Sequence, residues 1–423
     1  MGNTQINFID HEKFFDCVHC GLCLSFCPTY VELGTEMDSP RGRIVTMRAL
    51  QEGRLPLDDE VVRHLDLCLG CRACETACPS GVHYGELIEG VRPYIEQHYQ
   101  RPRLERLKRQ AINKVFPNPV GTRLFAFALK AGAALGLGRL ARWQKLPEQI
   151  RYWFGLLPGQ GGVTSSTLLE RYPAIGEKRF TVALLNGCVM PAVFGATNEA
   201  TVKVLRHNGC EVVVPRDQQC CGALLLHNGE KKTALALARR NIDVFSRFEL
   251  DALIINAAGC GSMMKEYGEL FKGDLVYRER AERLAGKMQD VSEFLGSIPL
   301  KKPTREIRAR ATYHDACHLA HGQGVREQPR ALLRAIPGLQ LVELNESDWC
   351  CGSAGTYNLT EPDMAHRLLN RKVNNIQETT ADVVVAGNPG CLMQIRAGFQ
   401  QRGLPTKVVH TVDLLAEAYA EQT

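Results

Sequence analysis

CVHCGLCLSFCP at residues 17–28 and CLGCRACETACP at residues 68–79 are two copies of one pattern, C-x2-C-x2-C-x3-C-P. Thiolates at this spacing hold [4Fe–4S] clusters. Within each run, three closely spaced cysteines can wrap one corner of an iron–sulfur cube, whereas the fourth lies too far round to close the same cluster. The two runs therefore predict two [4Fe–4S] clusters and a chain that moves single electrons between a donor and an acceptor.

The spacing resembles that of bacterial two-cluster ferredoxins, in which the fourth cysteine of each run ligates the other cluster. The resemblance implies one ligand set of Cys17, Cys20, Cys23 and Cys78, and a second of Cys68, Cys71, Cys74 and Cys27. Pairs of the C-x2-C type also build tetrahedral zinc sites, which need four ligands. Each run instead supplies three cysteines and a fourth followed by proline, which favours the iron–sulfur interpretation.

Composition and length are those of a globular protein with two or three domains: 423 residues, 45% hydrophobic and 23% charged. The N-terminal stretch MGNTQINFIDHEKFFDC contains no apolar signal region, so we expect a cytoplasmic chain whose cysteines stay reduced. The longest apolar stretch, residues 124–138, contains Lys130 and falls short of the ~20 residues that a bilayer requires. We therefore expect any contact with the inner face of the cell membrane to be peripheral.

The charge is distributed unevenly along the chain. Residues 101–151 contain twelve Lys or Arg and two acids, a net charge of +10 within a chain whose total is +5. Trp143 and Trp153 lie in or beside this stretch, and basic residues interleaved with aromatic ones suit an interfacial segment on anionic lipid. We expect peripheral membrane contact through residues 101–154, with a partner surface or a solvated linker as the alternatives. Nucleic-acid binding is not expected, because no recognition motif accompanies the charge.

Four parts follow along the chain: a helical domain with both cysteine runs (1–100), a basic helical connector (101–175), and two α/β units (176–305 and 306–423). In the first part, apolar residues recur at helical intervals between the runs, and Asp58 and Asp59 offer N-terminal capping chemistry. The predicted fold class is α+β and multidomain, a mostly helical two-cluster domain followed by duplicated α/β units with largely parallel sheets.

The duplication is visible in the cysteines. Cys188 and Cys220 are 32 residues apart and Cys317 and Cys350 are 33 apart, and a Cys-Cys-Gly triplet stands at 220–222 and again at 350–352. Apolar runs such as VALL, EVVVP and DVVVAG read as strands buried on both faces. Because ligands gather at the carboxyl ends of such strands, we expect two groups of metal-binding or redox cysteines: Cys188, Cys220, Cys221 and Cys260, and Cys317, Cys350, Cys351 and Cys391. Burial as small hydrophobic side chains is the alternative for these eight.

Two C-x2-C-x2-C-x3-C-P runs followed by two CCG repeats resemble the iron–sulfur subunit of bacterial glycolate oxidase. The strings CVHCGLCLSFCPTY, SPRGRI, CLGCRACETACPSGVHY, AAGCGSMMKEYG and CCGSAGTYNLT carry the resemblance, which spans essentially the whole chain. It implies that an FAD-containing partner oxidises glycolate to glyoxylate, and that this chain passes the electrons toward quinone and the respiratory chain. Equivalent subunits of lactate or glycerol-3-phosphate dehydrogenase complexes share the motif order.

Two features qualify the resemblance. No G-x-G-x-x-G fingerprint follows a strand, which places the flavin on another chain. The cysteine-rich domain of heterodisulfide reductases uses five cysteines per cluster, whereas Met263 and Gln394 occupy the last cysteine position here, which argues against a reductase of that type. A further iron–sulfur or metal centre in the CCG units remains a hypothesis, with His314 or His318 near it; for His314, His318 and His321 the alternative is a surface or hydrogen-bonded role.

Overall fold

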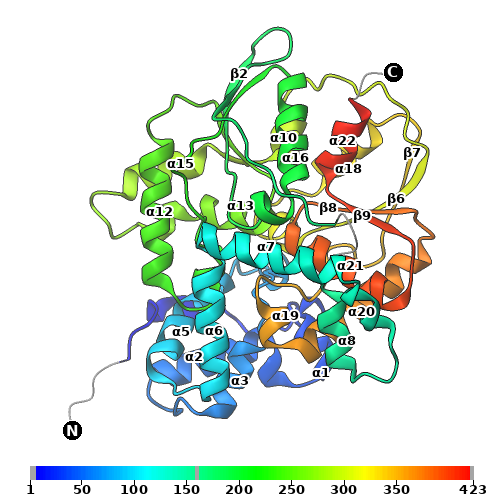
Figure 1. The fold of residues 1–423 in the computed structure, drawn as a ribbon. Helices are drawn as coiled ribbons and strands as arrows, with labels where there is room; N and C mark the ends of the chain where they lie inside the picture. Colours follow the sequence, from blue (N-terminus) through cyan, green and yellow to red (C-terminus); the bar gives the residue numbers. More distant parts are fainter. Residues whose placement is uncertain (1–5, 158–161, 420–423) are drawn as a thin grey trace.

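The computed structural model describes residues 6–157 and 162–419. Figure 1 shows a helical N-terminal part below two α/β units that lie side by side, with α7 (Pro119–Ala134) crossing where the three parts meet. This arrangement confirms the predicted fold class. The boundaries expected at 100, 175 and 305 stay predictions.

The N-terminal part is built from short helices between cysteine loops. Asp58 caps the helix ahead of the second run, because its carboxylate accepts a hydrogen bond from the Val61 backbone N–H at 2.9 Å. Ser39 caps the longer helix before it in the same way, with Pro40 at the first helical position. The helices here are α1 (Pro28–Leu33), α2 (Pro40–Gln51), α3 (Asp59–Asp66), α4 (Ala73–Thr76) and α5 (Tyr84–His98), with 3-10 turns η1 (His11–Phe14), η2 (Leu24–Phe26) and η3 (Glu36–Asp38).

The basic segment is helical and packs onto the α/β units. Ala126 and Leu129 of α7 are buried in the same hydrophobic core as the first sheet. Arg101 and Arg109 are also buried, and both bind Asp66 and Glu96, so these two cations are neutralised within the protein. The segment contains α6 (Arg103–Val115), α7, η4 (Leu137–Arg142) and α8 (Glu148–Gly155).

The two α/β units have equivalent sheets. The first has the strand order β1-β3-β2-β4-β5 and the second β7-β6-β8-β9; all neighbours are parallel except β1, which is antiparallel to β3. The strands are β1 (Arg171–Tyr172), β2 (Phe180–Leu184), β3 (Cys210–Val213), β4 (Ala252–Ile255), β5 (Met288–Asp290), β6 (Ala309–His314), β7 (Leu339–Val342), β8 (Val383–Ala386) and β9 (Lys407–Val409). β2, β3, β4 and β5 therefore correspond to β6, β7, β8 and β9, as the sequence repeat predicts.

Helices cover both sheets and join them. The helices of the first unit are α9 (Met190–Val193), α10 (Gly195–His207), α11 (Ala223–His227), α12 (Lys231–Phe245), α13 (Ala258–Lys265), α14 (Tyr267–Leu270), α15 (Arg278–Gly286) and α16 (Val291–Ser297). Those of the second are α17 (Cys317–Ala320), α18 (Glu327–Arg334), α19 (Tyr357–Thr360), α20 (Pro362–Glu378), α21 (Pro389–Arg402) and α22 (Thr411–Ala418). The C-terminal helix α22 packs on α10 of the first unit, and each of the two large hydrophobic cores takes side chains from both sheets.

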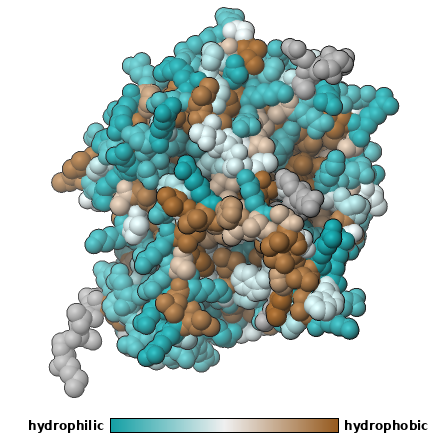
Figure 2. Space-filling model, in the orientation of Figure 1, coloured by the Kyte–Doolittle hydropathy of each residue, from teal (hydrophilic) through white to brown (hydrophobic). Residues whose placement is uncertain are grey.

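The outer face of α7 is apolar and basic. Leu124 and Phe127 are 65% and 70% exposed, and the exposed cations Arg123 and Lys130 lie on the same helix. Figure 2 shows hydrophobic side chains gathered in a band along α7 and toward α8. Across the described part of the chain, no helix is both long enough and apolar enough to span a membrane.

Candidate iron–sulfur and cysteine-rich sites

The first expected ligand set lies at the surface of the N-terminal part. Cys20 is exposed, and the other three sulfur-bearing side chains are half-buried. Burial raises the pKa of Cys17, and the nearby thiols of Cys78 and Cys20 raise it further. Burial likewise raises the pKa of Cys23 to about 11, with Cys17 as the next contributor. The structure thus brings Cys78 of the second run to the cysteines of the first.

The second expected set is buried. Cys27, Cys68, Cys71 and Cys74 line one small cavity of about 20 Å³. Burial raises the pKa of Cys74 well above its usual value, and the neighbouring thiols of Cys71, Cys68 and Cys27 add to the shift. Cys27 therefore faces the second run, in the crossed arrangement that the ferredoxin resemblance implies.

Polar groups surround the buried set. The Tyr84 hydroxyl donates to Cys68 Sγ at 3.5 Å, and the Gly70 backbone N–H donates to the same sulfur at 3.4 Å. Arg43 is 1% exposed and lies 3.9 Å from Cys27 Sγ, with Asp38 beside it at 3.5 Å. Hydrogen-bond donors and a cation near thiolates stabilise negative charge on sulfur.

The chemistry of these eight side chains fits iron–sulfur clusters. Buried thiols resist ionisation, as the raised pKa of Cys71 shows, unless a cation compensates the charge of the thiolate. Iron supplies that positive charge, and four sulfurs around one cavity are the donors that a cubane needs.

In the first α/β unit, all four CCG cysteines follow the carboxyl ends of adjacent strands: Cys188 follows β2, Cys220 and Cys221 follow β3, and Cys260 lies in α13 after β4. The Sγ atoms of Cys188 and Cys220 are 3.4 Å apart. Their shared hydrogen bond raises the pKa of Cys188 and lowers that of Cys220. The thiol of Cys260 contacts that of Cys221.

The second unit repeats this layout. Cys317 begins α17 after β6, Cys350 and Cys351 follow β7, and Cys391 lies in α21 after β8. Hydrogen-bonding contacts run from Cys317 to Cys350, from Cys350 to Cys351 and from Cys351 to Cys391. The hydrogen bond with Cys350, together with burial, keeps the pKa of Cys317 well above its usual value.

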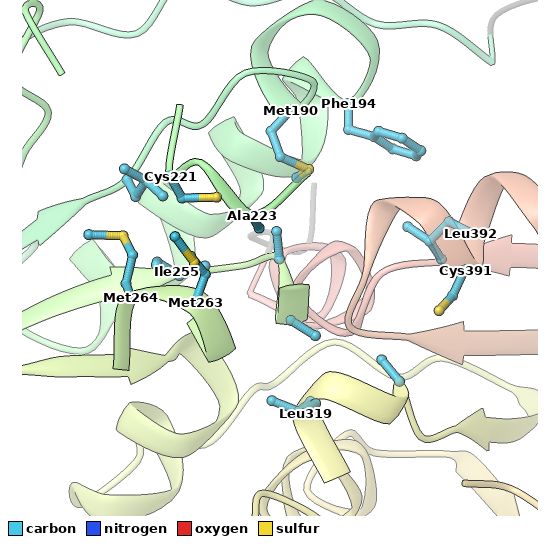
Figure 3. Packing of buried hydrophobic residues seen from close by; sticks show 14 of the residues in the cluster. Met190, Phe194, Cys221, Ala223, Ile255, Met263, Met264, Leu319, Cys391 and Leu392 are labelled. Atoms are coloured by element: carbon cyan, nitrogen blue, oxygen red, sulfur yellow. The ribbon is translucent and has the colours of Figure 1, made fainter. Parts of the chain in front are cut away.

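Both CCG groups face one cavity of about 370 Å³ between the units. Figure 3 shows Cys221 and Cys391 on ribbons of different units, with buried apolar side chains such as Met190, Met263 and Leu319 around them. A further wall is apolar and comes from the basic segment: Phe116, Phe125, Leu129, Trp153, Leu156 and Leu157. The cavity thus joins the cysteines to the segment whose outer face is exposed.

The loop of the second cysteine run docks on the second unit. After burial, the thiol of Cys317 is the next contributor to the raised pKa of Cys71. His318 Nε2 lies 2.9 Å from the Gly70 carbonyl, and the Tyr357 hydroxyl donates to the Leu67 carbonyl at 3.0 Å. The buried cysteine set and the second CCG group are therefore neighbours, although some 250 residues separate them in the chain.

The three expected histidines differ. His321 contacts Thr76, Arg326 and the Asp348 carbonyl, as expected of a hydrogen-bonded residue. His318 Nδ1 and both nitrogens of His314 are buried without a hydrogen-bond partner among the described residues.

Sequence patterns missed several residues of these sites. His227 binds Glu89 at 3.0 Å and its ring packs edge-on against His318; Arg72, within the second run, pairs with Glu266 of the first unit. The seventeenth cysteine, Cys210, is buried in β3 outside all four groups. The sequence signals Arg72 only as a charged residue inside a metal-binding run. Its partner, Glu266, is too distant in the chain for a local pattern to reveal the pair.

Comparisons with known proteins agree with this layout. A family model described as a 4Fe-4S dicluster domain matches residues 13–82, which confirms the prediction of two [4Fe–4S] clusters. A model described as a cysteine-rich domain matches residues 182–265 and 311–396. Among solved structures, a hypothetical protein from Helicobacter pylori has a TM-score of 0.45 and 10% identity, covering 79% of this chain and 76% of its own.

Similar sequences cover nearly the whole chain. A probable glycolate oxidase iron–sulfur subunit of Bacillus subtilis (strain 168) is 39% identical, covering 98% of this chain and 96% of its own length. The glycolate oxidase iron–sulfur subunit of Escherichia coli (strain K12) is 35% identical, covering 96% and 94%. A lactate utilization protein A of Halalkalibacterium halodurans is 34% identical but covers 55% of this chain and 96% of its own.

Proposed function

Because the chain belongs to the family of glycolate oxidase iron–sulfur subunits, we propose that it carries electrons within a 2-hydroxy-acid oxidase complex. In this proposal an FAD-containing partner oxidises glycolate to glyoxylate, and the electrons leave through this chain toward quinone. The chain is thus a component of an oxidoreductase complex, and the flavin site belongs to the partner.

One observation carries the proposal: the sulfur groups are arranged from the surface inward. The group with Cys20 is exposed to solvent, the group with Cys71 is buried, and Cys71 lies beside Cys317 of the CCG cavity. When bound, the two [4Fe–4S] clusters supply one-electron chemistry at the group with Cys20 and at the group with Cys71. The docking of the Gly70 loop on the second unit holds the group with Cys71 against the CCG cavity.

We propose the following ligand sets, which the proximity of the cysteines supports. The surface cluster takes Cys17, Cys20, Cys23 and Cys78, and the buried cluster takes Cys27, Cys68, Cys71 and Cys74. The eight CCG cysteines are assigned to metal binding or redox chemistry around the shared cavity.

The flavoprotein docks around the surface group. Phe15, Val18 and Leu22, all close in sequence to Cys17 and Cys20, are 53%, 67% and 58% exposed. Exposed apolar side chains at a redox site suit a protein partner, and electron-transfer contacts are small interfaces of this kind. A partner seated here brings its flavin near the most exposed sulfurs.

The acceptor side lies at the CCG cavity. Its volume of about 370 Å³ is within the range of small-molecule sites, and it combines apolar walls with a few polar groups. A quinone has a polar ring and an apolar tail, which match the cysteine-lined end and the wall of Phe125, Leu129 and Trp153. The exposed face of α7 lies on the other side of this wall and rests on anionic lipid at the inner face of the membrane.

A lactate-oxidising complex is the second candidate, favoured by the similarity to lactate utilization protein A. The two candidates differ in substrate and share the electron path. Assaying the purified complex with glycolate, lactate and glycerol 3-phosphate separates them, since only the true substrate bleaches the flavin of the partner.

Cysteine variants test the path itself. Cys71→Ser removes one ligand of the buried group and should abolish reduction of decylubiquinone by the complex, while glycolate oxidation with an artificial dye continues at the flavoprotein. Cys210→Ser is the matched control, because Cys210 is also buried but lies outside every sulfur group, and it should leave both activities unchanged. Quinone reduction that survives in Cys71→Ser would show that electrons bypass the buried cysteines.

A further inference from the structure

Three potential metal ligands converge in the second α/β unit. A ring nitrogen of His314 and the sulfurs of Cys351 and Cys391 all lie within 4.8 Å of one another, and all three residues are buried. His314 is the last residue of the central strand β6, and the two cysteines follow the flanking strands β7 and β8. The site therefore forms where three parallel strands end.

His314 has no other role in the described structure. Its side chain is 1% exposed and neither ring nitrogen makes a hydrogen bond, although the Ser347 carbonyl lies close enough to favour the protonated ring. A neutral imidazole can bind a metal ion through the lone pair of a ring nitrogen. A buried imidazole without a partner is costly unless something binds it.

The repeat shows that this histidine is particular to the second unit. His314 precedes Cys317 by three residues, and the residue three places before Cys188 in the first unit is Leu185. Leu185 is 2% exposed and packs in the hydrophobic core. A leucine therefore suffices for the fold at this place, and the imidazole needs a different explanation.

Two more thiols extend the group. Cys350 contacts both Cys351 and Cys317, so thiol contacts link Cys317 and Cys350 to the group of His314, Cys351 and Cys391. Structural zinc takes four ligands in a tetrahedron, and five donors exceed that number. A centre with several irons can use them all, and Cys71 of the buried cluster group lies beside Cys317 and Cys350.

We propose that His314, Cys317, Cys350, Cys351 and Cys391 hold a third iron–sulfur centre, with His314 as a nitrogen ligand. The thiols lose their protons to solvent when the irons bind, and the imidazole binds through its lone pair without releasing a proton. The role of the centre as an electron relay rests on the proposed function; its existence does not.

Metal content and pulsed electron paramagnetic resonance test the proposal in the anaerobically purified complex. Two [4Fe–4S] clusters account for about eight irons per chain, so the wild type should contain clearly more than eight. The reduced protein should show a nitrogen coupling whose frequency shifts when histidine is labelled with ¹⁵N. His314→Leu, which copies Leu185 of the first unit, should lose this coupling and the extra iron while both other clusters keep their signals.

Two further variants complete the test. His207→Ala, a histidine of α10 in the first unit, should leave coupling and iron unchanged. Cys391→Ser should also lose the extra iron. It replaces His314→Leu as the test of the third centre if His314→Leu does not fold. About eight irons in the wild type, zinc as the additional metal, or a nitrogen coupling that persists in His314→Leu would each overturn the proposal. A complex that contains the third centre but oxidises no hydroxy acid would instead refute only the proposed function.

Discussion

Replacing Arg43 by methionine should destabilise the N-terminal part strongly. Arg43 and Asp38 are each 1% exposed, and their charged atoms are 3.5 Å apart. At an effective dielectric constant of about 20, that separation corresponds to about 5 kcal/mol of attraction. Arg43→Met leaves the buried carboxylate with His64 as its remaining partner at 2.8 Å, and breaking a buried pair in this way costs about 3–5 kcal/mol. The two figures agree in order of magnitude.

The assay is guanidinium unfolding under anaerobic conditions, followed by the visible absorbance of the clusters. With a denaturant slope of about 4 kcal/mol per molar, a loss of 4 kcal/mol lowers the midpoint by about 1 M. Arg48→Met is the matched control on the same helix, because Arg48 pairs with Glu52 at the surface. This variant should shift the midpoint by only about 0.1 M. Equal shifts in the two variants, or a cost below about 1 kcal/mol for Arg43→Met, would refute the reasoning.

Three further predictions concern other parts of the chain. Burial raises the pKa of Glu361 from 4.5 to about 7. Because the pKa is higher in the folded state than in the unfolded state, ionisation of Glu361 weakens the fold as pH rises. In urea unfolding, Glu361→Gln should therefore raise the free energy of unfolding by about 1–2 kcal/mol at pH 8 and leave it unchanged at pH 4. Gly352 has φ +86° and a Cβ there would lie 2.5 Å from a carbonyl of α20, so Gly352→Ala should cost about 1–3 kcal/mol more than Gly324→Ala, whose Cβ meets nothing within 4 Å. Phe127→Glu should weaken sedimentation with phosphatidylglycerol vesicles about tenfold and Leu275→Glu should not; no change in either would assign α7 to a partner surface.

Much of the fold was predictable because its signals are local. The spacing of Cys17, Cys20 and Cys23 identifies a cluster loop without any knowledge of tertiary structure, since the three ligands lie on one turn of chain. The apolar strands and the repeated CCG triplets likewise indicate two parallel sheets with cysteines at one edge. The capping role of Asp58 follows from its place before a helical pattern.

The basic segment shows where such signals fail. A net charge of +10 over residues 101–151 suggests an available cationic surface. The structure pairs Arg101 and Arg109 with Asp66 and Glu96 of the preceding part, so only some of the charge faces outward. Charge counts cannot detect this, because the acidic partners are separated in sequence from the basic residues that they bind.

By itself, the sequence determined the cofactor class, the duplicated α/β architecture and the placement of the eight CCG cysteines after its strands. Each of these depends on residues spaced closely or periodically along the chain. Only the tertiary structure decided that Cys71 lies beside Cys317, that both CCG groups share one cavity, and that His314 is buried without a partner among the residues described. These relations arise when separately formed elements pack together to bury apolar surface. Such packing joins residues hundreds of positions apart, and no local pattern encodes it.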